Sequence, residues 1–218
     1  SYLKEQYGCT PIEYLDRLGV LDSHTLSAHS IRLTEQDISL MAKSGSSVAH
    51  CIGSNTKAAK GVAPVSSMLE HGMTVGLGTD GPASGNTLDL FTQMRFCANF
   101  HKNETGNRSV FPAKDIVSMA TIWGAGALGL DPLTGSLEPG KEADLVVVET
   151  DSPNMFPVYD PYSALVYSAR ADNVRDVFVA GRCLVKDKQL VSRDFRQIRE
   201  DLRQEMNQTA FGDMGNLV

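Results

Sequence analysis

Short apolar runs alternate with amphipathic segments through the first 130 residues of the chain. Strands are expected where β-branched and other apolar residues run together, over 25–29, 47–51 and 73–80. Helices are expected around them, over 10–18, 34–44, 62–72, 88–100 and 113–128. Thr34 precedes Asp37 by three residues, a spacing typical of a capping box at a helix start. Strands and helices joined by short connections predict a parallel sheet or barrel, and therefore an α/β fold.

The pattern changes after residue 134. Short β runs occupy 144–149, 174–179, 182–186 and 189–191, separated by glycine, proline and charged turns, and predict a small antiparallel sheet. The amphipathic, highly charged segment 195–208 predicts a helix. The chain thus divides into an α/β part at 1–134, the strands of a small β domain at 135–192, and a C-terminal helix and tail at 193–218.

Composition excludes several classes of function. With 218 residues, 42% of them hydrophobic, the chain can bury a substantial core. A formal net charge of −6 without clustered lysine and arginine argues against a nucleic-acid surface. The four cysteines are far apart, so we expect reduced, packed thiols. No apolar run is long enough to span a bilayer and no secretory leader opens the chain, so we expect a cytoplasmic protein without membrane contact.

Three of the predicted strands end at chemically reactive side chains. The first ends at His29, the second at His50, and the third runs into Asp80. Glycine, proline, serine and asparagine follow Asp80, so its carboxylate is expected beside a compact loop. Carboxyl ends of parallel strands meet at one rim, where α/β barrels keep their chemistry. Imidazole and carboxylate together favour metal-assisted hydrolysis, although Asp80 could instead cap a helix beginning near Asn86.

Other conspicuous residues have ordinary structural explanations. We expect His71 at a helix C-terminus on the surface, and His24 in a turn. His101 and Lys102 end a predicted helix and are expected to face solvent or a subunit partner. We expect Trp123 in the core, and residues 155–159 in the core or covering the barrel or an oligomer interface.

Several motifs, in order, resemble the second half of the amidohydrolase superfamily. They are 26–33 (LSAHSIRL), 48–55 (VAHCIGSN), 61–65 (GVAPV), 78–81 (GTDG) with Ser84 and Asn86, and 135–147 (GSLEPGKEADLVV). Within this superfamily the chain is similar to the branch of methylthioadenosine/S-adenosylhomocysteine deaminases and chlorohydrolase-like aminohydrolases. The resemblance implies the C-terminal part of a (β/α)8 barrel, carrying strands six to eight, followed by a small flanking β domain.

The resemblance also implies roles for individual residues. Asp80 corresponds to a metal ligand that accepts a proton from the attacking water, and His29 to a histidine that stabilises the tetrahedral adduct. His50 and Ser84 are expected to bind substrate. The resemblance implies one divalent metal ion, which is expected to be zinc, with iron as the alternative. The implied reaction is hydrolytic deamination of a purine-like or other amino-substituted N-heterocycle, with chlorohydrolysis of a triazine-like ring as the alternative.

The chain departs from this family in what it lacks. It contains neither the His-x-His of the first barrel strand nor the His-x-x-Glu of the fifth, and residues 1–8 resemble the segment just beyond that fifth strand. Ile52-Gly53 and Gly85 also differ from the usual loop residues. We therefore expect a fragment that needs the missing N-terminal half or a complementary chain, and that is inert alone as a half-barrel. A homo-oligomer is expected for the complete enzyme.

Overall fold

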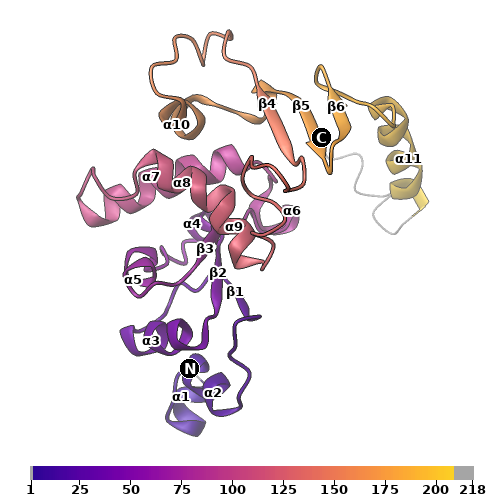
Figure 1. Ribbon diagram of the computed structural model, residues 1–218. Helices are drawn as coiled ribbons and strands as arrows, with labels where there is room; N and C mark the ends of the chain where they lie inside the picture. Colours follow the sequence, from indigo (N-terminus) through magenta and orange to yellow (C-terminus); the bar gives the residue numbers. More distant parts are fainter. Residues whose placement is uncertain (1, 209–218) are drawn as a thin grey trace.

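A three-stranded parallel sheet lies at the centre of the first part of the molecule. In the computed structural model, which describes residues 2–208, its order is β1 (Leu26–Ala28), β2 (Ser47–His50) and β3 (Val75–Leu77). Leu26 pairs with Ser47, and Val48 with Val75. Figure 1 shows helices α3 (Glu35–Ser44) and α5 (Val65–Glu70) beside these strands. The predicted α/β architecture with parallel strands is confirmed.

Hydrogen-bonding side chains set where the early helices begin. Helix α2 (Pro11–Arg17) follows a capping box made by Thr10 and Glu13, and α3 follows the predicted box of Thr34 and Asp37. The Thr10 hydroxyl also donates a hydrogen bond to the Asp37 carboxylate, so one buried aspartate links the starts of both helices. A satisfied cap stabilises a helix by about 1 kcal/mol, and here it also fixes the packing of α2 on α3.

The core lies between the sheet and the helices that cover it. Fully buried side chains come from α3, β2, α5 and α8 (Ala113–Ala120), namely Ile38, Met41, Val48, Met68, Ile116 and Met119. Helix α9 (Ile122–Ala127) approaches β3 so closely that a Cβ built on Gly76 would lie 2.8 Å from Gly124 Cα. The contact of α9 with β3 therefore requires glycine on the strand.

Several predicted boundaries needed correction. The helix expected over 113–128 is two helices, because Thr121 leaves helical geometry at φ −130° and ψ −102°. The helix expected from residue 62 begins only at Val65, since Pro64 disfavours helical geometry in the residue before it. The longest helix, α7, extends over Leu90–Thr105. Short helices not predicted are α1 (Tyr2–Tyr7), α4 (Ile52–Lys57), α6 (Pro82–Gly85) and α10 (Pro161–Ser163), with the π-helical segment Ala164–Ser168 and the 3-10 segment Ala171–Asn173.

The second sheet is antiparallel, as predicted. Its order is β4 (Leu145–Val148), β5 (Val174–Val179), β6 (Arg182–Lys186) and β7 (Gln189–Leu190). Helix α11 (Phe195–Gln208) follows it and has the predicted bounds. Figure 1 shows this sheet beyond α7, with α11 far from the N-terminus. The proposed domain boundaries stay predictions, and residues 209–218 lie outside the described part.

The aromatic residues near the second sheet are not all in the core. Met155 is buried, but Phe156 and Tyr159 are 73% and 94% exposed. Trp123 is half-buried against the core. The core assignment is therefore wrong for Phe156 and Tyr159. Within residues 2–208, no helix combines the length and apolar character that crossing a membrane requires.

Candidate active site

The carboxyl ends of the three parallel strands bring His29 and Asp80 to one rim. The His29 N–H donates to Ala49 O at 3.0 Å, and Gly78 N–H donates to His50 O at 3.1 Å, so the sheet pairing continues into both loops. His29 Nε2 then lies 3.8 Å from Asp80 Oδ2, with 40% and 26% of the two side chains exposed. An imidazole and a carboxylate thus face each other where a small molecule can reach them.

The backbone at this rim adopts a conformation that L-residues rarely take. His29, Ser30 and Asp80 have φ values of 67°, 50° and 62°. Left-handed geometry costs a non-glycine residue about 1 kcal/mol or more, and such strain concentrates at functional sites. Two of these three residues carry the facing imidazole and carboxylate. The facing pair therefore starts from strained backbone, which this chain also shows at residues such as Ala59, Phe111 and Lys188.

Asn55 fixes the orientation of the His29 ring. Its Oδ1 lies 2.8 Å from His29 Nδ1, and because an amide oxygen can only accept, Nδ1 carries the proton. The Nε2 atom is thereby directed toward Asp80. Asn55 lies in α4 and is 1% exposed, and its Nδ2 has no hydrogen-bond partner among the residues described. A buried amide with an unused donor is costly.

Helix α4 is in turn held by α7. Gly53 N–H donates a hydrogen bond to Gln93 Oε1 at 2.9 Å, and Gln93 is 1% exposed. A Cβ on Gly53 would lie 2.6 Å from the same oxygen, so the contact requires glycine. Asn55 belongs to the motif at 48–55, but its sequence context alone did not predict a role for it. Its place one turn beyond the end of a strand was the available signal.

Hydrogen bonds keep Asp80 ionised. Gly81 N–H donates to Asp80 Oδ1 at 2.7 Å. This bond, followed by hydrogen bonds from the Ser54 and Ser84 hydroxyls and the nearby His29, lowers the pKa of Asp80 to about 2, against a smaller opposing effect of desolvation. Asp80 does not cap the long helix: Asp89 does, accepting from Phe91 N–H at 2.9 Å. The capping explanation for Asp80 is therefore wrong.

The loop after Asp80 carries Ser84 and is tied to α4. Lys57 Nζ donates to Ser84 O at 2.8 Å and also binds Asn86 Oδ1. Ser84 is exposed, and its hydroxyl reaches Asp80. Lys57 belongs to the same helix as Asn55, so α4 positions both the ring of His29 and the loop opposite it.

His50 has a different environment from the other strand-end residues. Its side chain is fully buried, and its Nε2 lies 3.1 Å from His101 Nε2. Its contact with substrate stays a prediction, for which this burial gives no support. His101 is 3% exposed, so the expectation that it faces solvent is wrong. It lies on one face of α7 with Met94, Cys97 and Ala98, at spacings of three and four residues that predict burial.

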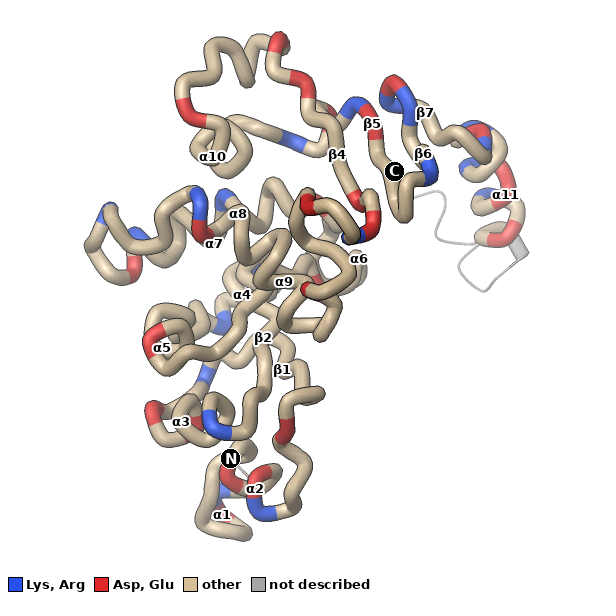
Figure 2. Tube along the Cα trace, in the orientation of Figure 1, with Lys and Arg blue, Asp and Glu red and all other residues tan. Residues whose placement is uncertain are grey.

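The remaining polar residues agree with their structural interpretations. His71 follows the end of α5, is exposed, and its Nδ1 lies 2.9 Å from Ser67 O. The cysteines form no disulfide, and Cys9, Cys51 and Cys97 are buried. Figure 2 shows basic and acidic residues interleaved along the chain, and the three parallel strands carry no lysine, arginine, aspartate or glutamate.

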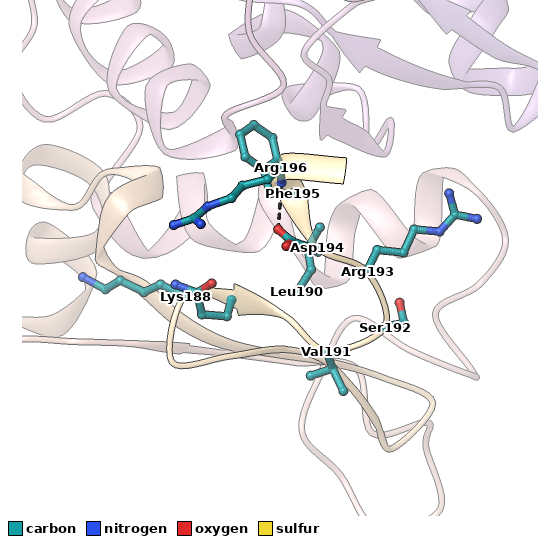
Figure 3. A pocket seen from close by; sticks show the side chains of 9 residues that line it. Lys188, Leu190, Val191, Ser192, Arg193, Asp194, Phe195 and Arg196 are labelled. Carbon is teal, nitrogen blue, oxygen red and sulfur yellow. Dashed lines mark hydrogen bonds between the residues drawn. The ribbon is translucent and has the colours of Figure 1, made fainter. Parts of the chain in front are cut away.

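A surface pocket lies elsewhere on the molecule. It is formed by residues 188–196, between β7 and the start of α11, and Asp194 Oδ1 in its wall accepts from Arg196 N–H at 2.8 Å (Figure 3). Lys188, another wall residue, pairs with Glu149 at 2.8 Å. Neither His29 nor Asp80 lines this pocket, so it is separate from the rim.

The rim residues suit a metal ion in kind but not in number. A carboxylate and an imidazole are donors that zinc accepts, whereas protein zinc sites use at least three such ligands. At the rim the described chain brings together Asp80 and His29. A zinc ion held there would need further ligands from outside this chain.

Comparison with known proteins identifies the family of the chain. Residues 1–184 match the amidohydrolase family, and the chain belongs to it. It is 41% identical over 198 residues to the 5-methylthioadenosine/S-adenosylhomocysteine deaminase of Syntrophobacter fumaroxidans, covering 91% of this chain and 45% of that protein. It is also 41% identical to the 5'-deoxyadenosine deaminase of Methanosarcina barkeri, covering 91% of this chain and 46% of that protein. The chain spans about half the length of these curated relatives.

Solved structures give the same result. An adenosine deaminase from Xanthomonas campestris with bound zinc has a TM-score of 0.91 and 35% identity, covering 95% of this chain and 47% of that one. An atrazine chlorohydrolase from Arthrobacter aurescens, in complex with zinc, has a TM-score of 0.86 and 30% identity over 91% of this chain and 44% of that one. The fold is thus shared by deaminating and dechlorinating enzymes.

Proposed function

We propose that the complete protein containing this chain deaminates a purine-like ring by hydrolysis, with His29 and Asp80 supplied from here. The observation that carries the proposal is the strained, partly exposed pair at the strand ends, where His29 Nε2 and Asp80 Oδ2 are 3.8 Å apart. Deaminases among the relatives support the reaction class. Ammonia is the leaving group in this proposal.

Each residue has a task that follows from its contacts. Asp80, kept ionised by its hydrogen bonds, takes the proton of the attacking water and can pass it toward the leaving amine. His29, oriented by Asn55, directs Nε2 toward the reacting carbon, and with a proton on Nε2 as well as on Nδ1 it donates to the charge that develops on the adduct. Ser84, on the exposed loop held by Lys57, contacts the substrate.

A divalent ion, with zinc preferred, belongs to this proposal. Asp80 would be the ligand from this chain, and the remaining ligands would come from the missing half. When bound, such an ion lowers the pKa of a water molecule so that hydroxide is available near neutral pH. Zinc in two structural neighbours supports the choice of metal.

The architecture of the complete protein is part of the same proposal. The strands β1, β2 and β3 are the sixth, seventh and eighth strands of a closed barrel, and the antiparallel sheet is its flanking β domain. Within the described residues β1 and β3 each pair with β2 alone, leaving two edges for the strands of an N-terminal half. Assembly as a homo-oligomer in the cytoplasm stays a prediction.

The substrate we propose is an adenine nucleoside modified at the 5' position. Relatives at about 41% identity are deaminases of such nucleosides, whereas the chlorohydrolase alternative rests on a structural neighbour at 30% identity. With two rim donors, this chain alone is expected to retain no stoichiometric zinc and to show no turnover.

One assay separates these alternatives. The complete zinc-loaded protein is incubated with 5'-methylthioadenosine and, separately, with atrazine, while ammonia and chloride release are measured. We expect ammonia from the nucleoside and no chloride from the triazine. Chloride release without ammonia would replace the proposal by the chlorohydrolase alternative. Turnover and one tight zinc in the isolated chain would contradict the need for a second half.

A further inference from the structure

Three metal-ligating side chains meet in the core, away from the rim. His50 ends β2, while Cys97 and His101 lie one turn apart on α7. One nitrogen of each ring and the Cys97 sulfur all lie within 4.8 Å of one another. The three residues are 0%, 0% and 3% exposed. Both elements belong to this chain, so the described residues bring all three side chains together.

The hydrogen bonding of this cluster is incomplete. His50 Nε2 and His101 Nε2 are 3.1 Å apart and can share only one proton. His50 Nδ1 has no partner within the described part of the chain. A buried nitrogen without a partner is costly, and the two facing Nε2 atoms are the ones placed to share a ligand.

The environment keeps both imidazoles in the form that binds metal. Desolvation, with a smaller effect of His101, lowers the pKa of His50 to about 3. Desolvation, with a smaller effect of Lys102, lowers the pKa of His101 to about 4. Neutral imidazoles offer a lone pair at physiological pH, whereas burial raises the pKa of the Cys97 thiol to about 12, so a bound ion must displace the thiol proton. Their 3.1 Å separation is also near the roughly 3.3–3.6 Å between two nitrogen ligands of one metal ion.

The surroundings select a singly charged, soft ion. The His101 ring packs on Phe111 with centroids 4.5 Å apart, and Met94 and Phe111 are each 5% exposed. Uncompensated charge is expensive in such a place. One thiolate neutralises a monovalent ion, whereas a divalent ion would keep a positive charge. Within residues 2–208 no fourth histidine, cysteine or carboxylate joins the group, and a thiolate with two imidazoles suits copper(I).

We propose that His50, Cys97 and His101 form a buried three-coordinate site for copper(I), separate from the His29–Asp80 rim. Binding forms a Cu–S bond and two Cu–N bonds, and the proton of the Cys97 thiol leaves to solvent. The bound ion would join β2 to α7 and raise the stability of the folded state by mass action.

The test uses the complete protein, with zinc already loaded and oxygen excluded. Copper(I) is titrated in competition with bicinchoninate, and X-ray absorption at the copper edge identifies the ligands. We expect one copper per chain, one sulfur and two nitrogen neighbours, and a higher unfolding temperature. Cys51 interacts with both rim residues, so two nitrogen neighbours beside the sulfur, together with the variants below, distinguish the two sites. Failure to retain copper, or a spectrum without sulfur, would overturn the proposal.

Copper binding by two cysteine variants shows whether the ion is bound at Cys97. Cys97→Ser should weaken copper binding more than about 100-fold, since even a hydrogen-bond partner of a ligand is worth 10–100-fold. Cys51→Ser is the matched control, because Cys51 is also buried and directly follows β2, and it should bind copper like the wild type. Circular dichroism checks that both fold. Unchanged binding in Cys97→Ser, or a second zinc at these residues in place of copper, would contradict the assignment.

Discussion

Asp80 in the parallel part and Asp176 in the antiparallel sheet both have a lowered pKa, but the two carboxylates lie in different environments. Asp176 is 2% exposed and fully partnered: Asp187 N–H and Arg175 Nε donate to its two oxygens at 2.9 and 3.0 Å. Asp80 is partly exposed, has φ 62°, and faces an imidazole across 3.8 Å. A lowered pKa alone therefore does not identify a site, and the feature that sets Asp80 apart is the partly exposed imidazole that it faces.

The largest loss of turnover is expected on substitution of His29, which faces Asp80 in the parallel part and has no counterpart beside Asp176 among the described residues. His29→Gln removes the imidazole facing Asp80, and turnover should fall by about 10²–10⁴-fold, the usual contribution of a positioned acid–base group. Zinc content should stay near that of the wild type, since Asp80 is retained. Ammonia release and bound zinc are measured in parallel. His71→Gln, at an exposed helix end, is the control, and equal losses in both variants would remove His29 from the site.

Substitution of Asn55 should lower activity less than substitution of His29, and should also move the pH profile. Asn55→Ala removes the acceptor of the His29 Nδ1 proton, and a partner of this type is worth about 10–100-fold in activity. Because the ring loses its fixed tautomer, the pH profile of kcat should also move. Asn99→Ala, on the exposed face of α7, should change neither quantity. A lower kcat with an unmoved pH profile would indicate that Asn55 only supports α4.

The rim also depends on the close contact beneath it. Gly76→Ala would place a Cβ 2.8 Å from Gly124 Cα, and overpacking of this kind costs about 1–3 kcal/mol. Gly126→Ala is the control on α9, because its Cβ would find Thr74 at an ordinary 3.6 Å. Denaturant unfolding measures both. A neutral Gly76→Ala would mean that α9 can move away from β3 without cost.

Asp176 should affect stability and its pH dependence, with turnover unchanged. The hydrogen bond from Asp187 N–H, followed by Arg175 and Lys186, lowers the folded-state pKa of Asp176 below its ordinary range. Its stabilisation is therefore present above the unfolded pKa and is lost as pH falls through the folded one. Asp176→Asn should unfold more easily at pH 7 and lose less stability on acidification. An unchanged acid limb in thermal melts would contradict this.

The two regions also differ in how far sequence predicts them. The strand of Val174–Val179 and the helix of Phe195–Gln208 have the expected bounds, since local patterning determines both. The position of His29 and Asp80 on one rim could be predicted from the parallel strands and from the resemblance to the amidohydrolase superfamily. The break at Thr121 was missed. The bond between Asn55 and His29 was missed because it joins segments 26 residues apart in sequence. The burial of His101 was visible in the spacing of its α7 neighbours, and was overlooked.

Asp80, unlike Asp176, is expected to take part in the chemistry of the complete protein. The most direct measurement compares Asp80→Asn with Asp176→Asn in that protein, recording bound zinc and ammonia release from 5'-methylthioadenosine at pH 7. We predict that Asp80→Asn loses zinc or about 10²–10⁴-fold in turnover while remaining folded, and that Asp176→Asn keeps both properties. Wild-type zinc and turnover in a folded Asp80→Asn protein would contradict the account.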